Sequence, residues 1–285
     1  MAVIGVTDMA DARADVISQL VQETIAERSQ LLPLVTRYDA PAGMKQLTIP
    51  RRGIVSASEL DGEGDAEVSA SAFSFSGDDI ILKQYAARCD VSDMAKLSSP
   101  VNVEEEVIKE LGASLARQID DIILTELTTT GNYSLAAHKF EFDADGTGTE
   151  IIKGDVLKAR RLLRVNGAIY GDDGQTFCVC HPQVEESLLQ IADFVDASKY
   201  GSNVPVQRGE LGTIFGVKFI SHADLNNDQA VVFHRSAVGL AMQKDYSLEY
   251  FRDVKSLNDV YTGSMVAGAK MLSEGKRAVL MDESP

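Results

Sequence analysis

The sequence has no tryptophan, only three cysteines among 285 residues, and 6% aromatic residues. The low aromatic content leaves few side chains on which nucleic-acid bases or sugar rings could stack. Three cysteines do not form a disulfide framework, and so small a number is typical of a protein from a reducing cytoplasm. The composition therefore excludes a small secreted scaffold that is held together by disulfides.

Positive charge is also scarce, because 27 lysines and arginines face 43 aspartates and glutamates, which gives a formal net charge of −16. Proteins bind nucleic acid tightly largely by neutralising phosphates with Lys and Arg. The acidic balance argues against tight binding of DNA or RNA, although it allows a protein that lies beside them. No segment has the roughly 20 apolar residues of a membrane span. The start, Met1–Val6, lacks the basic and apolar regions of a signal peptide.

The length and the hydrophobic content, 45% of 285 residues, are sufficient for a large core. A chain of this size buries roughly three quarters of its unfolded surface, and its length suggests one large unit or two smaller ones. Helix-like and strand-like segments interleave without the regular rhythm of a doubly wound parallel sheet. The expected fold class is therefore α+β.

Residues 9–32 predict an amphipathic helix that Asp8 can cap and that ends at Pro33. Its apolar positions recur at near-helical spacing and are Met9, Ala12, Val16, Leu20, Ile25 and Leu31. Two interpretations stay open: an arm that packs on another molecule, or a helix that docks on its own domain. In the first case Val16 and Leu20 are candidate contact residues between subunits.

Residues 44–91 change to strand-like periodicity, and small or apolar residues alternate with serine over residues 68–76. An acidic stretch with two glycines and no base lies between the two halves. The simplest geometry is a long β-hairpin whose acidic end projects into solvent or onto a partner. Two-stranded ribbons are marginal when isolated, so a partner surface is favoured over a surface loop without a role. The candidate contact residues at this end are Glu59, Asp61, Glu63, Asp65 and Glu67.

The clearest helix is expected from Val103 to Leu127. Asn102 and Glu105 match a capping box, and three consecutive glutamates suit the positive end of the helix dipole. One apolar stripe then runs for about seven turns. Its members are Val103, Val107, Leu111, Leu115, Ile119, Ile122 and Leu127. Shorter helices are predicted over residues 155–165 and 182–195.

Strands are predicted in the second half of the chain by short runs of β-branched, aromatic and small apolar residues. They span residues 175–180, 217–220, 230–233, 238–243, 260–272 and 277–281. A glycine-rich stretch over residues 203–216 predicts a loop.

No pattern in the sequence indicates a catalytic, cofactor or metal site. Asp143–Gly146 begins like a calcium loop, but the third acid and the distal Glu of that loop are absent. Cys178 and Cys180 share one face of a predicted strand without a second pair at zinc spacing, so we expect them to be buried as small hydrophobic residues. The four histidines are isolated, and the glycines form neither a phosphate loop nor a dinucleotide fingerprint.

The pair Asp120–Asp121 falls within the predicted long helix, on or near its apolar stripe. Two neighbouring acids can serve as a general acid and a general base. A structural contact at a subunit boundary, or a solvated face, is the favoured interpretation.

Three segments carry a resemblance to a known family. Residues 115–124 (LARQIDDIIL) resemble the end of the spine helix of tailed-bacteriophage major capsid proteins, where Ile-Asp followed by aliphatic residues is frequent. Residues 212–221 (GTIFGVKFIS) resemble the family's Gly-x-x-x-Gly segment that enters a strand, and residues 231–241 (VVFHRSAVGLA) its strand-turn-strand. Their order, together with the helical arm and the long hairpin, resembles the Hong-Kong-97-type coat fold over essentially the whole chain.

The resemblance implies an N-terminal arm (1–43), an extended hairpin loop (44–91), a peripheral domain with the spine helix (92–130 and 247–285) and a mainly axial domain (131–246). It implies a major capsid protein, not an enzyme, that needs no cofactor. Copies of the chain would assemble as hexamers and pentamers into an icosahedral shell around double-stranded phage DNA. The hairpin of one subunit would lie over the peripheral domain of the next.

Further partners follow from the same resemblance. Members that carry their own scaffolding region begin with a long helical extension, whereas here the predicted arm starts almost at Met1. A separate scaffolding protein, or an extension already removed, is therefore expected together with a portal, and a decoration protein is a further option. The expected location is the virion capsid, after synthesis in the bacterial host cytoplasm and without a membrane.

Two other functions stay open at this stage. Encapsulin nanocompartments resemble the same fold and enclose enzymes instead of DNA, although the long acidic hairpin favours a virus. The scattered Asp and His residues would also allow a cytoplasmic hydrolase, which is a protein of a different class.

Overall fold

The computed structural model describes residues 29–53, 75–99, 102–142, 151–165, 174–190 and 213–282. Most of the predicted N-terminal helix, with Val16 and Leu20, lies outside these ranges. The same holds for the five acids predicted at the hairpin end, Glu59, Asp61, Glu63, Asp65 and Glu67. These candidate contact residues therefore stay predictions.

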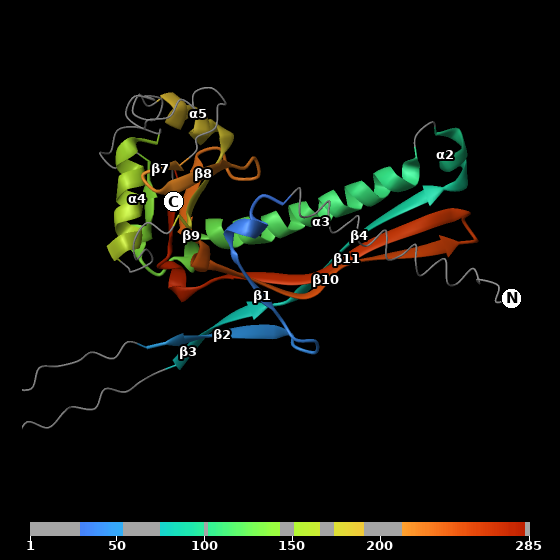
Figure 1. Cartoon of the computed structure of the whole chain (residues 1–285), viewed down its shortest axis with the longest axis horizontal. Helices are drawn as coiled ribbons and strands as arrows, with labels where there is room; N and C mark the ends of the chain where they lie inside the picture. The colour runs from blue at the N-terminus through green and yellow to red at the C-terminus, as the bar shows by residue number, and fades with distance from the viewer. Residues whose placement is uncertain are drawn as a thin grey trace, which may run out of the picture.

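One half of the molecule is elongated and consists of long strands beneath one long helix (Figure 1). Its four-stranded sheet has the order β1-β10-β11-β4. These strands span Thr36–Asp39 (β1), Val238–Asp253 (β10), Asn258–Met271 (β11) and Lys83–Ser92 (β4). Helix α3 (Val103–Thr128) lies along β11 and β4. The α2 helix (Asp93–Ser98) follows β4 at the far end of the sheet.

Helix α3 confirms the long predicted helix, with three glutamates in its first turn. The predicted capping box is wrong in its detail. The Asn102 amide donates to the Glu105 carboxylate over 2.9 Å, and its side chain accepts no hydrogen bond from the backbone of the first turn. Because Asn102 and Glu105 are both exposed, this contact tethers two side chains at the surface and leaves the first amides of the helix to other partners.

The buried face of α3 is wider than the predicted stripe. Ile122 is only half-buried, whereas Ile123, which falls outside the stripe, is fully buried. The side chains that α3 contributes to the main core are Ile108, Leu111, Leu115, Ala116, Ile119, Ile123, Leu124 and Leu127. At Gly263 of β11 an added Cβ would lie 3.2 Å from Leu115 Cδ1, so the helix rests closely on the strand there.

The other half of the molecule is built around a six-stranded sheet with the order β5-β12-β9-β6-β8-β7. Its strands are Lys139–Glu141 (β5), Thr176–Cys180 (β6), Thr213–Ile214 (β7), Val217–Ser221 (β8), Gln229–His234 (β9) and Ala278–Asp282 (β12). Helices α4 (Lys153–Val165) and α5 (Pro182–Gln190) lie beside this sheet (Figure 1). Short 3₁₀ turns connect elements in both halves, at Leu32–Leu34, Thr130–Asn132, Ala136–His138, Arg235–Ala237 and Ser273–Gly275.

Strand β6 lies between two cores. Phe177 and Val179 belong to the main core that α3 shares, while Cys178 and Cys180 belong to a second core that contains residues of α4 and α5. Burial raises the pKa of the Cys180 thiol to about 12, with a smaller contribution from Glu185. The expectation that both cysteines are buried small residues is confirmed.

Two strand pairings cross the predicted segment boundaries, which themselves stay predictions. Residues 278–282, grouped by sequence with the peripheral segment 247–285, pair with β5 and β9 of the six-stranded sheet. Residues 83–92, grouped with the hairpin loop 44–91, pair with β11. Strand β10 also runs ten residues beyond its predicted end at residue 243. The alternation in that extension is weak, because much of it is exposed on both faces.

Candidate assembly surfaces

The root of the predicted hairpin is an antiparallel pair, β2 (Gln46–Arg52) with β3 (Phe75–Ile81), in register from Gln46↔Ile81 to Arg52↔Phe75. This pair leaves the body below the long sheet (Figure 1). At Gly268 of β11 an added Cβ would meet the Ile81 carbonyl oxygen at 2.1 Å. The hairpin therefore crosses β11 at a point that requires glycine.

Polar contacts hold the hairpin root against the turn before β12. The Ser273 backbone amide donates to Asp78 Oδ2 over 2.9 Å. Arg51 Nη2 lies 2.6 Å from Glu274 Oε1. Hydrogen bonds from Lys276 and Arg51 lower the pKa of Glu274. Ser273 and Glu274 both have positive φ angles, 56° and 57°, so the turn that receives the hairpin has a strained backbone.

The hairpin root also exposes large apolar side chains. Ile80 is fully buried, whereas its neighbour Ile81 is 63% exposed and Phe75 is 68% exposed. A two-stranded ribbon has no core in which such side chains could be buried. The exposed side chain of Ile81 is therefore a candidate contact for a partner.

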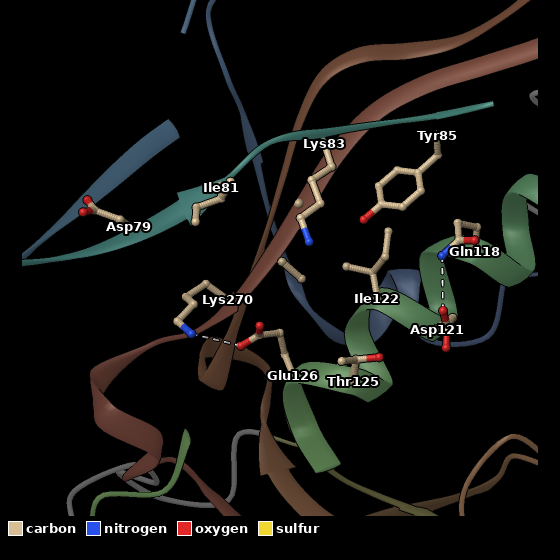
Figure 2. A pocket seen from close by; sticks show the side chains of 12 residues that line it. Asp79, Ile81, Lys83, Tyr85, Gln118, Asp121, Ile122, Thr125, Glu126 and Lys270 are labelled. Atoms are coloured by element: carbon tan, nitrogen blue, oxygen red, sulfur yellow. Dashed lines mark hydrogen bonds and ion pairs between the residues drawn. The ribbon is translucent and has the colours of Figure 1, made fainter. Parts of the chain in front are cut away.

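A trough runs between α3 and the edge strand β4. One pocket of about 380 Å³ lies beside the C-terminal half of α3 (Figure 2). It contains Tyr85, the paired side chains of Gln118 and Asp121, and Lys270 at 3.5 Å from Glu126. Burial, with the nearby Asp121 charge, raises the pKa of Tyr85.

A second pocket of about 610 Å³ lies further along the same two elements, beside the N-terminal half of α3. Its apolar lining is Ala87, Cys89, Val103, Val107 and Leu111. On β4, Lys83 and Tyr85 line the first pocket, and Ala87 and Cys89 line the second. The apolar share of the lining is thus larger beside the N-terminal half of α3 than beside its C-terminal half.

The far end of the long sheet exposes a third set of apolar side chains, here called the distal tip. It combines α2 with the turn between β10 and β11, at the end of the molecule away from the six-stranded sheet (Figure 1). The Asp93 amide donates to the Leu257 carbonyl over 3.2 Å, which joins the two segments. The distal tip consists of Met94, Leu97, Phe251, Val254 and Leu257, all exposed by more than half.

An ion-pair network fixes the backbone beneath the distal tip. Arg252 bridges Asp93, over 2.5 Å, and Asp259, over 2.9 Å. Lys96 pairs with Asp259 and, over 2.6 Å, with Glu104. Burial alone would raise the pKa of Asp259, but hydrogen bonds from Lys96, Arg252 and Tyr250 lower it to about 2. The exposed apolar side chains therefore sit on an ordered support.

The pair Asp120–Asp121 divides between two environments. Asp121 is exposed on α3. Asp120 is 4% exposed and accepts a hydrogen bond from Ser29 Oγ over 2.7 Å. Sequence analysis favoured a subunit boundary or a solvated face, and for Asp120 this is corrected: its partner belongs to the same chain. The sequence distance of 91 residues hides this contact from any local pattern.

The distal tip was also missed by sequence analysis. Phe251, Val254 and Leu257 are three residues apart, but the segment forms a strand and a turn, so this spacing did not indicate a surface. The only available signal was large apolar residues within an otherwise polar segment. Among the described residues, no three His, Cys, Asp or Glu side chains gather as metal ligands. No helix in the described part of the chain has the length and apolar character to cross a membrane.

An elongated body with an outlying hairpin and exposed apolar ends is suited to contacts between copies, and the fold defines the class of Hong-Kong-97-type coat proteins. Residues 45–281 match the family model described as phage capsid protein. The chain belongs to this phage capsid protein family and is a structural protein of a capsid shell. None of the curated proteins matches the sequence.

Solved structures share the fold at low sequence identity. A Mycobacterium phage Che8 chain is 18% identical with a TM-score of 0.65, over 83% of this chain and 85% of the other. The capsid of Ralstonia phage GP4 is 16% identical with a TM-score of 0.68, over 87% and 86%. A virus-like particle from Pyrococcus furiosus is 10% identical with a TM-score of 0.60, over 95% and 99%.

Proposed function

We propose that this capsid protein assembles as hexamers and pentamers into an icosahedral shell that encloses double-stranded phage DNA. The distal tip is the observation that carries the proposal. It exposes five large apolar side chains at one end of the subunit, while the hairpin exposes others elsewhere. Contacts between two different patches of identical subunits generate closed rings, and a further patch can join rings into a shell.

The segments of the subunit have separate roles in this proposal. Residues 1–43 form the arm and residues 44–91 the extended hairpin with its root at β2 and β3. The peripheral domain comprises residues 92–130 and most of 247–285, without β12. The axial domain comprises most of residues 131–246. The hairpin of one subunit lies over the neighbouring peripheral domain.

The net charge of −16 supports a wall that surrounds DNA without binding it tightly. We propose that the chain acts without catalysis, is made in the host cytoplasm and depends on a separate scaffolding protein and a portal. A decoration protein is a further partner of such a shell. The Pyrococcus furiosus virus-like particle has the same fold, so the fold alone does not distinguish a virus from an encapsulin-type compartment.

Electron microscopy of the purified full-length chain tests assembly. Uniform closed particles tens of nanometres across are expected, and a monomer under all conditions would contradict the proposal. Particles recovered from the producing cells and treated with nuclease should then retain double-stranded DNA. Particles that instead hold one enzyme and no DNA would establish the encapsulin alternative.

Deleting Asp61–Asp65 tests the hairpin end. We expect the melting temperature of the unassembled subunit to stay unchanged, while particle yield falls, because the end of a ribbon adds little to the core of its own chain. A matched variant keeps the length of the hairpin and replaces the same acids with Asn and Gln. Comparing the two variants separates the effect of the negative charge from the effect of the hairpin's length. A drop of several degrees in the melting temperature would assign the segment to the subunit's own stability.

A further inference from the structure

Asp120 is a buried carboxylate of α3 that accepts hydrogen bonds from residues 29–31, the first residues that the structure describes. Its Oδ1 accepts from Ser29 Oγ over 2.7 Å and from the Leu31 amide over 3.2 Å. Its Oδ2 accepts from the Gln30 amide over 3.1 Å. Ser29 Oγ in turn accepts from the Leu32 amide over 3.3 Å. One side chain thus satisfies three donors from three consecutive residues.

This arrangement fixes both position and direction. Two consecutive amides that point at one carboxylate define the orientation of the backbone at residues 30 and 31, and charge-assisted hydrogen bonds are about twice as strong as neutral ones. Leu31 is fully buried in the main core beside this contact. The backbone at residues 29–31 is therefore held at a fixed point on α3.

His222 brings the other half of the molecule to the same carboxylate. It follows β8 of the six-stranded sheet, and its backbone amide donates to the Cys180 carbonyl over 2.9 Å. Its ring Nε2 lies 3.7 Å from Asp120 Oδ2. Its Nδ1 accepts from the Asp224 backbone amide over 3.3 Å and lies 3.8 Å from Asp224 Oδ2. The His222 side chain is 10% exposed.

We infer that Asp120 and His222 position residues 29–31 on the body of the subunit: Asp120 holds these residues, and protonated His222 strengthens this hold while linking it to the six-stranded sheet. Both are positioning residues, since their contacts are with the chain that they orient. The inference concerns the subunit itself and does not depend on the shell.

The charged and titratable surroundings of His222 are defined for the described residues. Arg117 and Asp120 from α3 and Asp224 from the same loop line the adjoining cavity of about 350 Å³. Arg117 is exposed and pairs with Glu110 over 2.5 Å. Burial raises the pKa of the Tyr246 phenol on β10. The nearby charge of Asp120 raises this pKa further, whereas Arg37 lowers it.

The attraction of Asp120 raises the pKa of His222 above its ordinary 6.5 and outweighs the opposing effect of burial. A histidine whose pKa is raised by folding contributes stability that is fully present below the unfolded pKa. That contribution is lost as the pH rises through the raised pKa. Residues 29–31 should therefore be held more firmly at pH 5.5 than at pH 8.5.

Amide hydrogen exchange on the full-length chain measures this hold directly, through the protection factors of the Gln30 and Leu31 amides. Asp120→Asn should reduce them roughly tenfold to a hundredfold, because it removes hydrogen bonds to a charged acceptor. Asp121→Asn makes the same change at the exposed neighbouring position and should leave them unaltered. Equal protection in wild type and Asp120→Asn would overturn the assignment.

The pH dependence separates positioning from general stability. Protection factors, which are corrected for intrinsic exchange, should fall severalfold between pH 5.5 and pH 8.5 in wild type. His222→Gln keeps a donor but cannot titrate, so its protection should be independent of pH. His181→Gln, at the end of the neighbouring strand β6, should retain the wild-type dependence. A flat wild-type profile, or an unchanged slope in His222→Gln, would contradict the role of His222 without requiring Asp120→Asn to fold.

Discussion

The apolar side chains near the two ends of α3 lie in opposite environments. In its C-terminal half, Ile119, Ile123 and Leu127 are fully buried by the subunit's own sheets. Beside its N-terminal end, the distal tip leaves Leu97 83% and Val254 75% exposed. One end of the helix therefore completes the fold of a single chain, whereas the other lies beside apolar side chains that the chain leaves uncovered and that we propose contact a second copy.

The largest effect is expected at the buried end. Ile119→Asp should lower the free energy of unfolding by roughly 4 kcal/mol or more, because it places an unpaired charge among apolar side chains. Half-buried Ile122→Asp, one turn away, can direct its charge to water and should cost less than about 1.5 kcal/mol. Chemical denaturation of both soluble variants checks the difference. Equal losses would mean that the buried face of α3 is misassigned.

The contrast between the two ends of α3 could be predicted from the sequence only in part. The spacing of Leu111, Leu115 and Ile119 predicts the buried face of α3, because helical periodicity records which side meets the core. The same spacing misplaces Ile122 and Ile123, since two sheets and residues 29–31 together cover a wider arc of the helix than one stripe.

Contacts between distant segments could not be predicted from the sequence. Asp120 reads locally as a polar interruption of the stripe, and only the fold brings Ser29 to it. The sequence around Gly268 does not indicate which segment crosses it, yet the absence of a Cβ at Gly268 allows the Ile81 backbone to lie against β11. The distal tip was unpredictable for a related reason: periodicity reports burial within one chain, and these apolar side chains are exposed on that chain.

An intermediate effect is expected from the ion pairs that support the distal tip. A pKa lowered from 3.8 to about 2 for Asp259, which is 6% exposed, corresponds to about 2 kcal/mol of stability at pH 7. The sign follows from linkage: a depressed carboxyl pKa stabilises the fold above pH 4, and this stability is lost as the pH falls to 2. Asp259→Asn should therefore reduce stability most at neutral pH.

Urea unfolding of wild type and Asp259→Asn between pH 2 and pH 7 measures this dependence. The two curves should converge toward pH 2, where about half of the native carboxyl groups are protonated and most of the stability from the depressed pKa is lost. Asp121→Asn, an exposed carboxylate of the same charge, is the control and should follow wild type throughout. A constant difference between wild type and Asp259→Asn at all pH values would show that the network contributes packing and not charge.

The smallest effect on the subunit, and the sharpest test of the comparison, is expected at the distal tip. The double variant Leu97→Gln with Val254→Gln should change the free energy of unfolding by less than about 0.5 kcal/mol for each site, because neither side chain is covered by its own chain. Assembly followed by light scattering should nevertheless need at least tenfold more protein, since burying each such side chain against a partner contributes about 1.5–3 kcal/mol.

Lys255→Gln lies on the same turn, removes no apolar surface and should leave both the unfolding and the assembly curves unchanged. A double variant that assembles normally would mean that the distal tip faces solvent in the shell. A double variant that loses several kcal/mol would mean that the subunit itself covers the tip. The proposal requires that the double variant forms stable subunits that assemble more weakly. One end of α3 would then stabilise the subunit, and the other would lie at a contact between subunits.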